Sequence, residues 1–435
     1  MATKEKKIKE EKKEKVKKTP KQKRRIALKV IISIILIIAL LAGILAVLNL
    51  VSIKSNEAFI NDNIETVKYE KQLKPVKDDK GRYTFVTDED FKILQITDVH
   101  IGGGVMSSSK DSEAINAVAA MVTEEKPDLV VVTGDIAYPV PYQSGTFNNI
   151  LSAKLFAGLM EKLGVYWCLC FGNHDTELYS YADREKISNI YESKAYPHCL
   201  FTSGDKKVDG YGNYVINIKD KKGALVQSLF MFDSHSYVDG DYFGIKWKYD
   251  CVHKNQVEWY EKTVKELTDE NGAQPKSLAF FHIPPKEMAE AYTEYKDAGY
   301  KDTDNVKVKY GVIKEGGEFI GSSNYNYGLF DSFRKNGTQG VFFGHDHLNN
   351  MSLEYKGVRL TYGYSIDFLA YPGINKYGLQ RGCSPITVKP DGTFESTQEN
   401  YYQTKYVSIK EKSPVDLEKD MADETGGVEN PFAEE

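Results

Sequence analysis

The sequence repeats one local pattern, in which a short apolar run ends in a cluster of chemically active polar side chains. In the first half, the polar residues Asp98, Asp135 and Asn173 follow such runs at steps of 37 and 38 residues. Each step has room for one helix and one strand, and apolar residues recur at helical spacing between the runs. Strands that alternate with helices pair in parallel. The spacing therefore predicts a β-α-β-α-β unit with these residues at the carboxyl edge of its sheet.

The predicted fold class is α/β, with a second half that is richer in strands. In the first half we expect strands over 92–96, 129–132 and 165–170, and helices over 115–122 and 151–163. In the second half we expect a hairpin from 214–219 and 224–233, then strands over 278–281, 341–343, 358–362 and 385–389. All the polar clusters are expected at one sheet edge.

Five segments carry the polar clusters, and five of the eight histidines lie in them. The segments are Asp98-Val99-His100, Gly134-Asp135, Gly172-Asn173-His174-Asp175, Phe281-His282 and Gly344-His345-Asp346-His347. Imidazole and carboxylate groups bind zinc, iron and manganese, and a set this large can hold two ions. Taken singly, Asn173 and Asp175 are more often helix caps or turn residues, and His282 a core histidine. Together, the five segments predict a dinuclear metal centre for phosphate-ester hydrolysis.

The order of these segments resembles the calcineurin-like metallophosphoesterase superfamily, whose signature is D-x-H, G-D, G-N-H-D/E, a lone histidine and G-H-x-H. All five blocks occur in order within residues 91–347. The longer sequence segments around Asp98 and Asn173 are most similar to those of the purple-acid-phosphatase-29-like branch. The resemblance implies a four-layer α/β/β/α sandwich and a metal-bridging hydroxide as the nucleophile.

The resemblance also implies a role for each polar residue. One metal would be bound by Asp98, His100 and His347, the other by Asn173, His282 and His345, and both by Asp135. The ions would be divalent or trivalent: Fe, Mn or Zn. His174 would protonate the leaving oxygen or stabilise the charge on it. Asp175 is the candidate to orient His174.

Several other residues are candidates for the site. Tyr138 lies in a G-D-x-x-Y block, which in purple acid phosphatases supplies a tyrosine ligand to ferric iron. Those enzymes have D-x-G in the first block, so His100 makes Tyr138 redundant, and we expect it to line the cleft or pack beneath it. His235 is expected to be a surface or packing histidine, and Arg381 could face a substrate phosphate. The five cysteines form no spaced framework, and Cys168 and Cys170 are expected to be buried.

The N-terminal region predicts a membrane anchor. Val30 to Leu48 is a run of 19 residues without a charge, long enough to span a bilayer as a helix. Residues 1–29 carry 14 Lys and Arg against 4 Glu. This basic flank should stay in the cytoplasm, which places the chain after Ile53 outside the cell membrane in a single pass. Secretion after cleavage of a signal peptide is the alternative, but no small-residue cleavage pattern closes the run.

Charge and composition divide the chain further. Residues 30–435 carry 43 basic against 58 acidic residues, so no nucleic-acid partner is expected. The expected partners are the membrane, through residues 30–53, and a phosphorylated small-molecule or cell-surface substrate. The predicted segments are a basic cytoplasmic segment (1–29), an anchor (30–53), a stalk (54–90), a metallophosphoesterase domain (91–410) and an acidic disordered tail (411–435).

Three alternatives for the function stay open at this point. A phosphodiesterase or nucleotide pyrophosphatase would use the same site. A non-catalytic surface protein would use the fold to bind phosphate, but such proteins usually lack ligands or the histidine at the position of His174. A surface adhesion or assembly protein would place its function in the stalk or tail.

Overall fold

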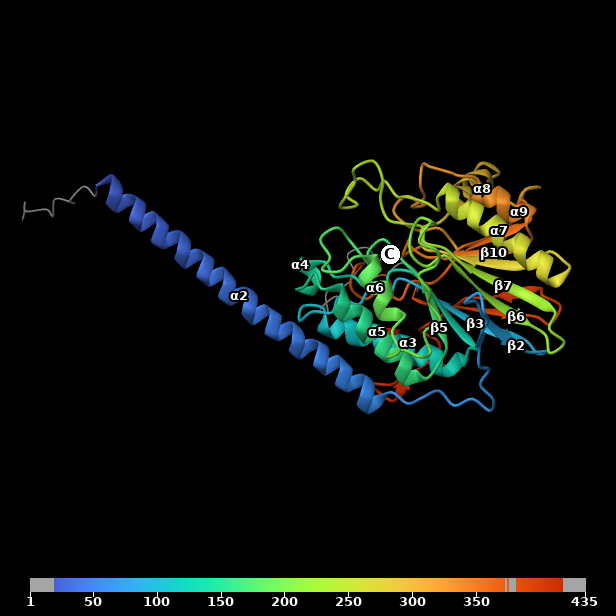
Figure 1. Cartoon of the computed structure of the whole chain (residues 1–435), viewed down its shortest axis with the longest axis horizontal. Coiled ribbons are helices and arrows are strands. Elements are labelled where there is room, and N and C mark those ends of the chain that lie inside the picture. Colours follow the sequence, from blue (N-terminus) through green and yellow to red (C-terminus); the bar gives the residue numbers. More distant parts are fainter. Residues whose placement is uncertain (1–18, 372–373, 375–380, 418–435) are drawn as a thin grey trace, which may run out of the picture. The chain divides into compact units, whose positions relative to one another are not determined.

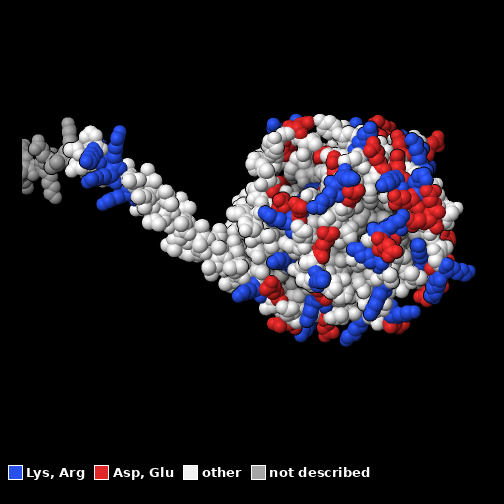
Figure 2. All heavy atoms as spheres, viewed as in Figure 1, with Lys and Arg blue, Asp and Glu red and all other residues white. Residues whose placement is uncertain are grey.

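The computed structural model describes residues 19–371, 374 and 381–417, and the chain divides into two units, Met1–Leu48 and Asn49–Glu435. Helix α2 (Pro20–Asn63) crosses this division. Its apolar stretch has a mean hydropathy of 3.3 and is fully exposed, so by length and composition it could be a membrane anchor or a signal sequence. Basic side chains gather at the start of the helix, and the stretch after them carries no charge (Figure 2).

Two β-sheets form the centre of the second unit. The six-stranded sheet has the order β14-β13-β3-β4-β5, with β15 paired to β13. Strands β3, β4 and β5 are parallel, and β13 pairs antiparallel with β3. The strands are β3 (Phe91–Ile96), β4 (Leu129–Thr133), β5 (Trp167–Cys170), β13 (Gly382–Val388), β14 (Phe394–Ser396) and β15 (Glu399–Asn400).

The nine-stranded sheet is mixed and has the order β1-β2-β6-β7-β8-β10-β12-β11-β9. Its central strands β7, β8, β10 and β12 are parallel neighbours. The strands are β1 (Val76–Lys77), β2 (Tyr83–Val86), β6 (Tyr214–Lys219), β7 (Leu225–Met231), β8 (Ser277–Phe280), β9 (Val306–Tyr310), β10 (Thr338–Phe343), β11 (Ser352–Tyr355) and β12 (Val358–Tyr362). A separate pair joins β16 (Val407–Ser408) to β17 (Ser413–Pro414).

Helices cover the outer faces of the two sheets (Figure 1). Residues of α3 and α5 belong to one hydrophobic core with β3, β4 and β5, and residues of α7, α8 and α9 belong to a second core with β8 and β10. The helices are α3 (Ser108–Glu125), α4 (Pro141–Ser144), α5 (Asn149–Leu163), α6 (Arg184–Tyr191), α7 (Lys254–Asn271), α8 (Lys286–Asp297) and α9 (Leu329–Lys335).

Alternation along β8 shows how the nine-stranded sheet separates the two cores. Leu278 and Phe280 belong to the core shared with the six-stranded sheet, whereas Ala279 and Phe281 belong to the core under α7, α8 and α9. Successive side chains of a strand point to opposite faces, so a strand buried on both faces reads as a continuous apolar run. The result is a four-layer α/β/β/α sandwich, as predicted.

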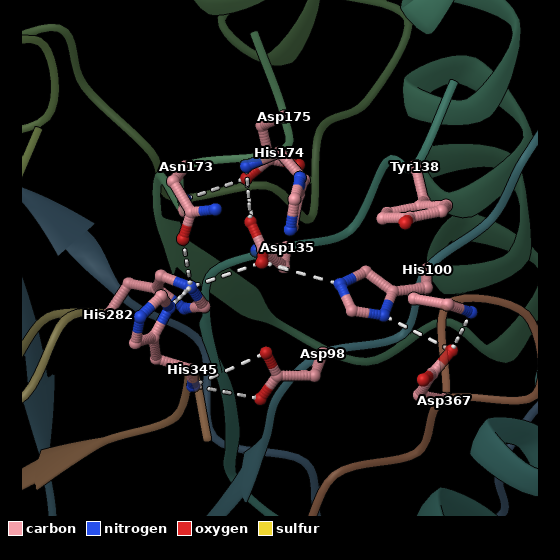
Figure 3. A network of polar contacts seen from close by, with 12 residues as sticks. Asp98, His100, Asp135, Tyr138, Asn173, His174, Asp175, His282, His345 and Asp367 are labelled. Carbon is pink, nitrogen blue, oxygen red and sulfur yellow. Dashed lines mark hydrogen bonds and ion pairs between the residues drawn. The ribbon is translucent and has the colours of Figure 1, made fainter. Parts of the chain in front are cut away.

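The β-α-β-α-β unit predicted from the spacing is β3-α3-β4-α5-β5, and the predicted hairpin is β6-β7. The prediction of one common sheet edge is wrong. Strands β3, β4 and β5 belong to one sheet, and β8 and β10 belong to the other. The carboxyl ends of both sets of strands converge, so the polar clusters meet at a junction between the two sheets (Figure 3).

Much of the predicted stalk, residues 54–90, belongs to helix α2 and to two strands in the structure. Residues up to Asn63 continue α2, and β1 and β2 are edge strands of the nine-stranded sheet. Asn49, Ser52 and Asn56 are buried, because their side chains bond to backbone groups of the domain. These polar residues therefore form a docked face of the helix. Of the predicted tail, only residues 411–417 are described, and the remainder lies outside the described residues.

Candidate metal centre

The ends of five strands deliver the predicted site residues. Asp98 and His100 follow β3, Asp135 follows β4, and Asn173 and His174 follow β5. His282 follows β8, and His345 and His347 follow β10. Figure 3 shows most of these side chains turned toward one another. The structure therefore brings together all seven predicted ligands and His174.

The backbone at these strand ends is unusual. Asp98, His100, Asp135 and His345 adopt left-handed conformations, with φ of 52°, 52°, 54° and 81°. A residue with a side chain pays a steric penalty in this region and keeps such a conformation only where the surrounding structure fixes it. Four of the seven predicted ligands share the feature, which is typical of a functional site.

The glycines that precede the ligands are required by close approach. A Cβ on Gly172 would overlap the carboxylate of Asp135, and a Cβ on Gly344 would overlap the side chains of Thr97 and Asp98. Neither glycine has a positive φ, so conformational freedom is not the reason for it. The motifs G-N-H and G-H-x-H therefore begin with glycine because the loops pack directly on the ligands of neighbouring strands.

Asp98, His100 and His347 form the first group of ligand atoms, which all lie within 4.8 Å of one another. Asp98, Asp135 and His282 form a second such group. The carboxylate of Asp135 faces both sets of residues: its Oδ2 is 3.3 Å from His100 Nε2 and 3.1 Å from His282 Nε2. This is the position expected of a carboxylate that bridges two ions.

The hydrogen bonding of His282 is suited to a cation at the second set of ligands. His282 Nδ1 lies 2.8 Å from the carbonyl of Thr133, so this nitrogen carries a proton, and a cation would take the lone pair of Nε2 in place of a second proton. That nitrogen faces Asp135 Oδ2 at 3.1 Å, Asn173 Oδ1 at 3.1 Å and His345 Nδ1 at 3.3 Å. A single proton on Nε2 can be shared with one of these acceptors at a time, whereas a metal ion held here would draw on several of them together.

The electrostatics of the centre are set by its buried carboxylates. Burial by itself would raise the pKa of Asp135, but His282, His174 and His100 hold this pKa well below its usual range. Burial opposes the charged form of His282, and Asp135 nevertheless raises its pKa to about 9. Asp135 is therefore ionised, as a bridging ligand must be.

Asp367 is a site residue that the sequence prediction missed. Its two carboxylate oxygens lie 3.2 Å from His100 Nδ1 and 3.2 Å from His347 Nδ1, and the side chain is fully buried. These contacts are charge contacts without the alignment of hydrogen bonds. They leave Nε2 of each ring facing the centre, the arrangement that fixes metal-binding histidines. Asp367 lies five residues after β12, whose sequence Val-Arg-Leu-Thr-Tyr is not an apolar run, so the pattern that marked the other site residues does not mark this one.

The prediction that Asp175 orients His174 is corrected by the structure. Asp175 accepts hydrogen bonds from the backbone N–H groups of Asp135, Ala137 and Gly172 and thereby joins the loops after β4 and β5. The ring of His174 instead has Glu177 beside it, with Nδ1 2.8 Å from Oε1. No sequence signal marked Glu177, because a lone acid three residues after a histidine is common on any surface.

Tyr138 lies against the centre without reaching it through its hydroxyl. Its ring packs 4.9 Å from the rings of His100 and His174, and its hydroxyl donates to Gln143 Oε1 at 3.1 Å. Burial and the neighbouring acids raise the pKa of this phenol far above its usual value. Tyr138 therefore stays a neutral phenol that packs beside two site histidines.

The remaining candidates have structural surroundings. His235 stacks on His253 at 4.0 Å, and its Nε2 faces Gln256 Oε1 at 2.9 Å. His253 lies between Asp209 and Asp250, at 2.9 and 3.1 Å. Arg381 is fully buried and donates to the carbonyls of Ile366 and Asp367, so it supports the segment that carries Asp367.

Arg184 is a third residue that the sequence prediction missed. It forms an ion pair with Asp233 and donates to the carbonyls of Gly172 and His235. It thus ties the loop that carries Asn173 to the loop after β7.

The five cysteines are free. Burial raises the pKa of Cys168 to about 12, so this thiol stays protonated.

Comparison with known proteins places the region that holds the site in a known family. The model of the calcineurin-like phosphoesterase family matches residues 91–349, more than half of the chain. A solved structure of a dimetal phosphatase from Danio rerio is similar over 72% of this chain and 96% of its own, with 11% identity and a TM-score of 0.43.

Curated relatives match over most of the same region. "Probable inactive purple acid phosphatase 29" of Arabidopsis thaliana is 26% identical over 339 residues, 72% of this chain and 80% of the relative. "Probable inactive purple acid phosphatase 14" of the same plant is 29% identical over 66% of this chain and 73% of its own. Phosphatase DCR2 of Saccharomyces cerevisiae is 28% identical over 61% of this chain and 46% of its own. The chain belongs to the calcineurin-like phosphoesterase family.

Proposed function

We propose that this chain hydrolyses phosphate esters at a dinuclear metal centre, and that α2 anchors it in the cell membrane with the catalytic domain outside. The observation that carries the proposal is the position of Asp135. Its carboxylate lies between His100 and His282, at 3.3 and 3.1 Å, with the other predicted ligands arranged around these two rings. Three of the relatives are named inactive, but this chain retains every ligand block of the signature.

Each ion would have its own ligand set. One would be held by Asp98, His100 and His347, the other by Asn173, His282 and His345, and Asp135 would hold both. When bound, the ions lower the pKa of water and draw charge from the phosphoryl oxygens. Three neutral ligands in the second set leave the centre net positive, which favours binding of a phosphate group.

His174 is the group placed to act on the leaving oxygen. Its side chain is 26% exposed, whereas those of His100 and His282 are fully buried. Its backbone N–H donates to Asp135 Oδ1 at 2.8 Å, which fixes the residue beside the bridging carboxylate. An exposed imidazole next to buried ligands can reach a substrate and pass a proton to it.

The proposed location rests on the apolar helix and its charged start. The exposed apolar stretch of α2 is long enough to cross a bilayer, and Lys21, Lys23, Arg24 and Arg25 lie at its beginning. Positive charge stays on the cytoplasmic side, so the domain after the helix would be outside.

One experiment tests activity and location together. Intact cells that express the full chain receive an aryl phosphate that cannot cross the membrane, and a bis-aryl phosphate in parallel. We expect hydrolysis of the aryl phosphate outside the cells, and a loss of about a thousand-fold, equal to about 4 kcal/mol, in Asp135→Asn. Asp128→Asn is the matched control, because Asp128 accepts the N–H of Lys92 at the opposite end of β4.

The outcomes separate the alternatives. Hydrolysis that appears only after lysis would contradict the outward orientation and leave the reaction intact. Faster hydrolysis of the bis-aryl phosphate would favour a phosphodiesterase. Equal turnover by Asp135→Asn and the parent chain would refute the proposed centre, and metal binding without turnover of any ester would favour a phosphate-binding protein.

A further inference from the structure

Glu177 occupies a position beside the proposed proton donor that its own packing does not explain. Its side chain is 2% exposed, and Oε1 lies 2.8 Å from Nδ1 of His174. Its other oxygen, Oε2, is buried and has no hydrogen-bond partner among the described residues. Burying a carboxylate is costly unless it is paired, so a structural role would call for a lysine or arginine at this point. The described ion pairs of Glu177 include His174 alone.

Tyr237 connects Glu177 to a predicted metal ligand. Its hydroxyl donates to Glu177 Oε1 at 3.0 Å and accepts from Asn173 Nδ2 at 2.9 Å. Because the amide nitrogen of Asn173 is used in this way, its Oδ1 faces His282 Nε2 at 3.1 Å. Oε1 of Glu177 thus accepts from both His174 and Tyr237. The network runs from His174, the proposed proton donor, to Asn173, a predicted metal ligand.

We propose that Glu177 is the positioning residue for His174: by accepting the proton on Nδ1 in a hydrogen bond, it holds the ring so that Nε2 serves the leaving oxygen. This inference rests on the proposed function. A carboxylate only accepts hydrogen bonds when ionised, so it selects the ring orientation in which Nδ1 carries a proton. The proton that His174 transfers is then the one on Nε2.

The reaction can be written with every atom assigned. The oxygen of water forms a bond to phosphorus, and the ester bond between phosphorus and the leaving oxygen breaks. The proton on His174 Nε2 moves to the leaving oxygen and gives an alcohol. The attacking water leaves one hydrogen on the new phosphate and loses the other as a proton, which returns to Nε2. The proton on Nδ1 stays in its hydrogen bond with Glu177 throughout.

This role predicts an effect that depends on the leaving group. An alkyl oxygen is a strong base and needs a proton as it leaves, whereas nitrophenolate leaves readily as an anion. General acid catalysis contributes about 10²- to 10⁴-fold where it is needed. Loss of Glu177 should therefore slow the hydrolysis of alkyl phosphates much more than that of nitrophenyl phosphate.

The test uses the full chain in detergent micelles, loaded with Mn²⁺, and a series of esters from nitrophenyl through phenyl to alkyl phosphate. For Glu177→Gln we expect kcat/KM to fall no more than about threefold on nitrophenyl phosphate and about 10²-fold on the alkyl ester. Tyr237→Phe, which keeps the carboxylate and removes one donor, should give the same selectivity with a smaller loss. This second variant keeps the test decisive if Glu177→Gln folds poorly.

Glu161→Gln provides a matched control within the same chain. Glu161 Oε2 lies 2.6 Å from Nδ1 of His198, so the two residues form a glutamate–histidine pair like that of Glu177 and His174. Neither residue of this pair belongs to the predicted site. We expect this variant to keep the leaving-group dependence of the parent chain. Equal loss on all esters in Glu177→Gln and Tyr237→Phe would overturn the positioning role. An unmodified chain with no turnover of any ester would instead overturn the proposed function, and this inference with it.

Discussion

Asp367 shows how a single carboxylate can organise several ligands of a metal centre. It faces the Nδ1 atoms of His100 and His347, each at 3.2 Å, and its oxygens also accept the backbone N–H groups of Leu369, Ala370 and Tyr371. Burial disfavours its charge, but the two histidines hold the pKa of Asp367 well below its usual range. The carboxylate is thus a fixed negative charge behind two of the four proposed ligands to one ion.

Asp367→Asn should weaken metal binding at that ion's position. The amide keeps the shape of the side chain but removes the charge that orients both rings, and loss of such a partner typically costs 10- to 100-fold in metal affinity. Competition between the full chain and a calibrated chelator measures this affinity. Asp241→Asn is the control, because Asp241 is a buried carboxylate that accepts the backbone N–H groups of Lys246 and Lys248. Unchanged affinity in Asp367→Asn, or equal loss in both variants, would contradict the assignment.

At the residue scale, the sequence predicted the groups that bear the chemistry better than those that support them. Asp98, Asp135 and His282 follow buried strands directly, so local pattern placed them. Glu177 and Tyr237 meet at His174 although 60 residues separate them along the chain, and this contact depends on how the loop after β7 packs over the loop after β5. Local sequence does not encode such a contact.

At the scale of the elements, His253 joins three parts of the domain. It precedes α7, and its ring faces Asp209 on one side and Asp250 on the other. Hydrogen bonding to Asp250, against the opposing effect of burial, raises its pKa to about 9 from 6.5. A cation at this position therefore pins the start of α7 to the two loops that carry these acids.

This raised pKa predicts a pH dependence of stability. A histidine whose pKa is higher in the folded state stabilises fully below its unfolded pKa, near 6.5, and this stabilisation is lost as the pH rises through about 9. We expect His253→Gln to lower the free energy of unfolding by about 1 kcal/mol more at pH 6 than at pH 10. The value is reduced from the full shift because the side chain is 29% exposed to solvent.

Chemical denaturation of the full chain in micelles at the two pH values measures this difference. Interactions of His253 that do not depend on its charge are lost equally at pH 6 and pH 10, so they cancel when the two changes in the free energy of unfolding are compared. The same destabilisation at pH 6 and pH 10 would show that the charge of His253 contributes nothing.

The elements also show why part of the fold escaped prediction. The unit β3-α3-β4-α5-β5 is local, and its parallel strands read as continuous apolar runs. By contrast, β2 pairs with β6 more than a hundred residues later, and its own pattern carries no mark of that partner. Polarity concealed how the end of α2 packs, because Asn49 and Ser52 of the predicted anchor and Asn56 of the predicted stalk bury their side chains against backbone carbonyls rather than water.

For the whole molecule, the architecture explains how one site can be assembled from blocks spread over 250 residues. Two sheets pack face to face, and the ends of β3, β4 and β5 meet those of β8 and β10. Each sheet alone supplies an incomplete ligand set: Asp98, His100, Asp135 and Asn173 come from one, and His282, His345 and His347 from the other. We therefore expect metal binding to be coupled to the packing of the sandwich.

This coupling makes metal-dependent turnover the central test. The full chain is stripped with a chelator, and the rate of aryl phosphate hydrolysis is measured as Mn²⁺ or Zn²⁺ is returned in known equivalents. We predict no turnover in the stripped chain, and a rate that rises until two equivalents per chain are bound. A folded chain that turns over substrate equally well without metal, or that binds two equivalents and hydrolyses no ester, would contradict the account.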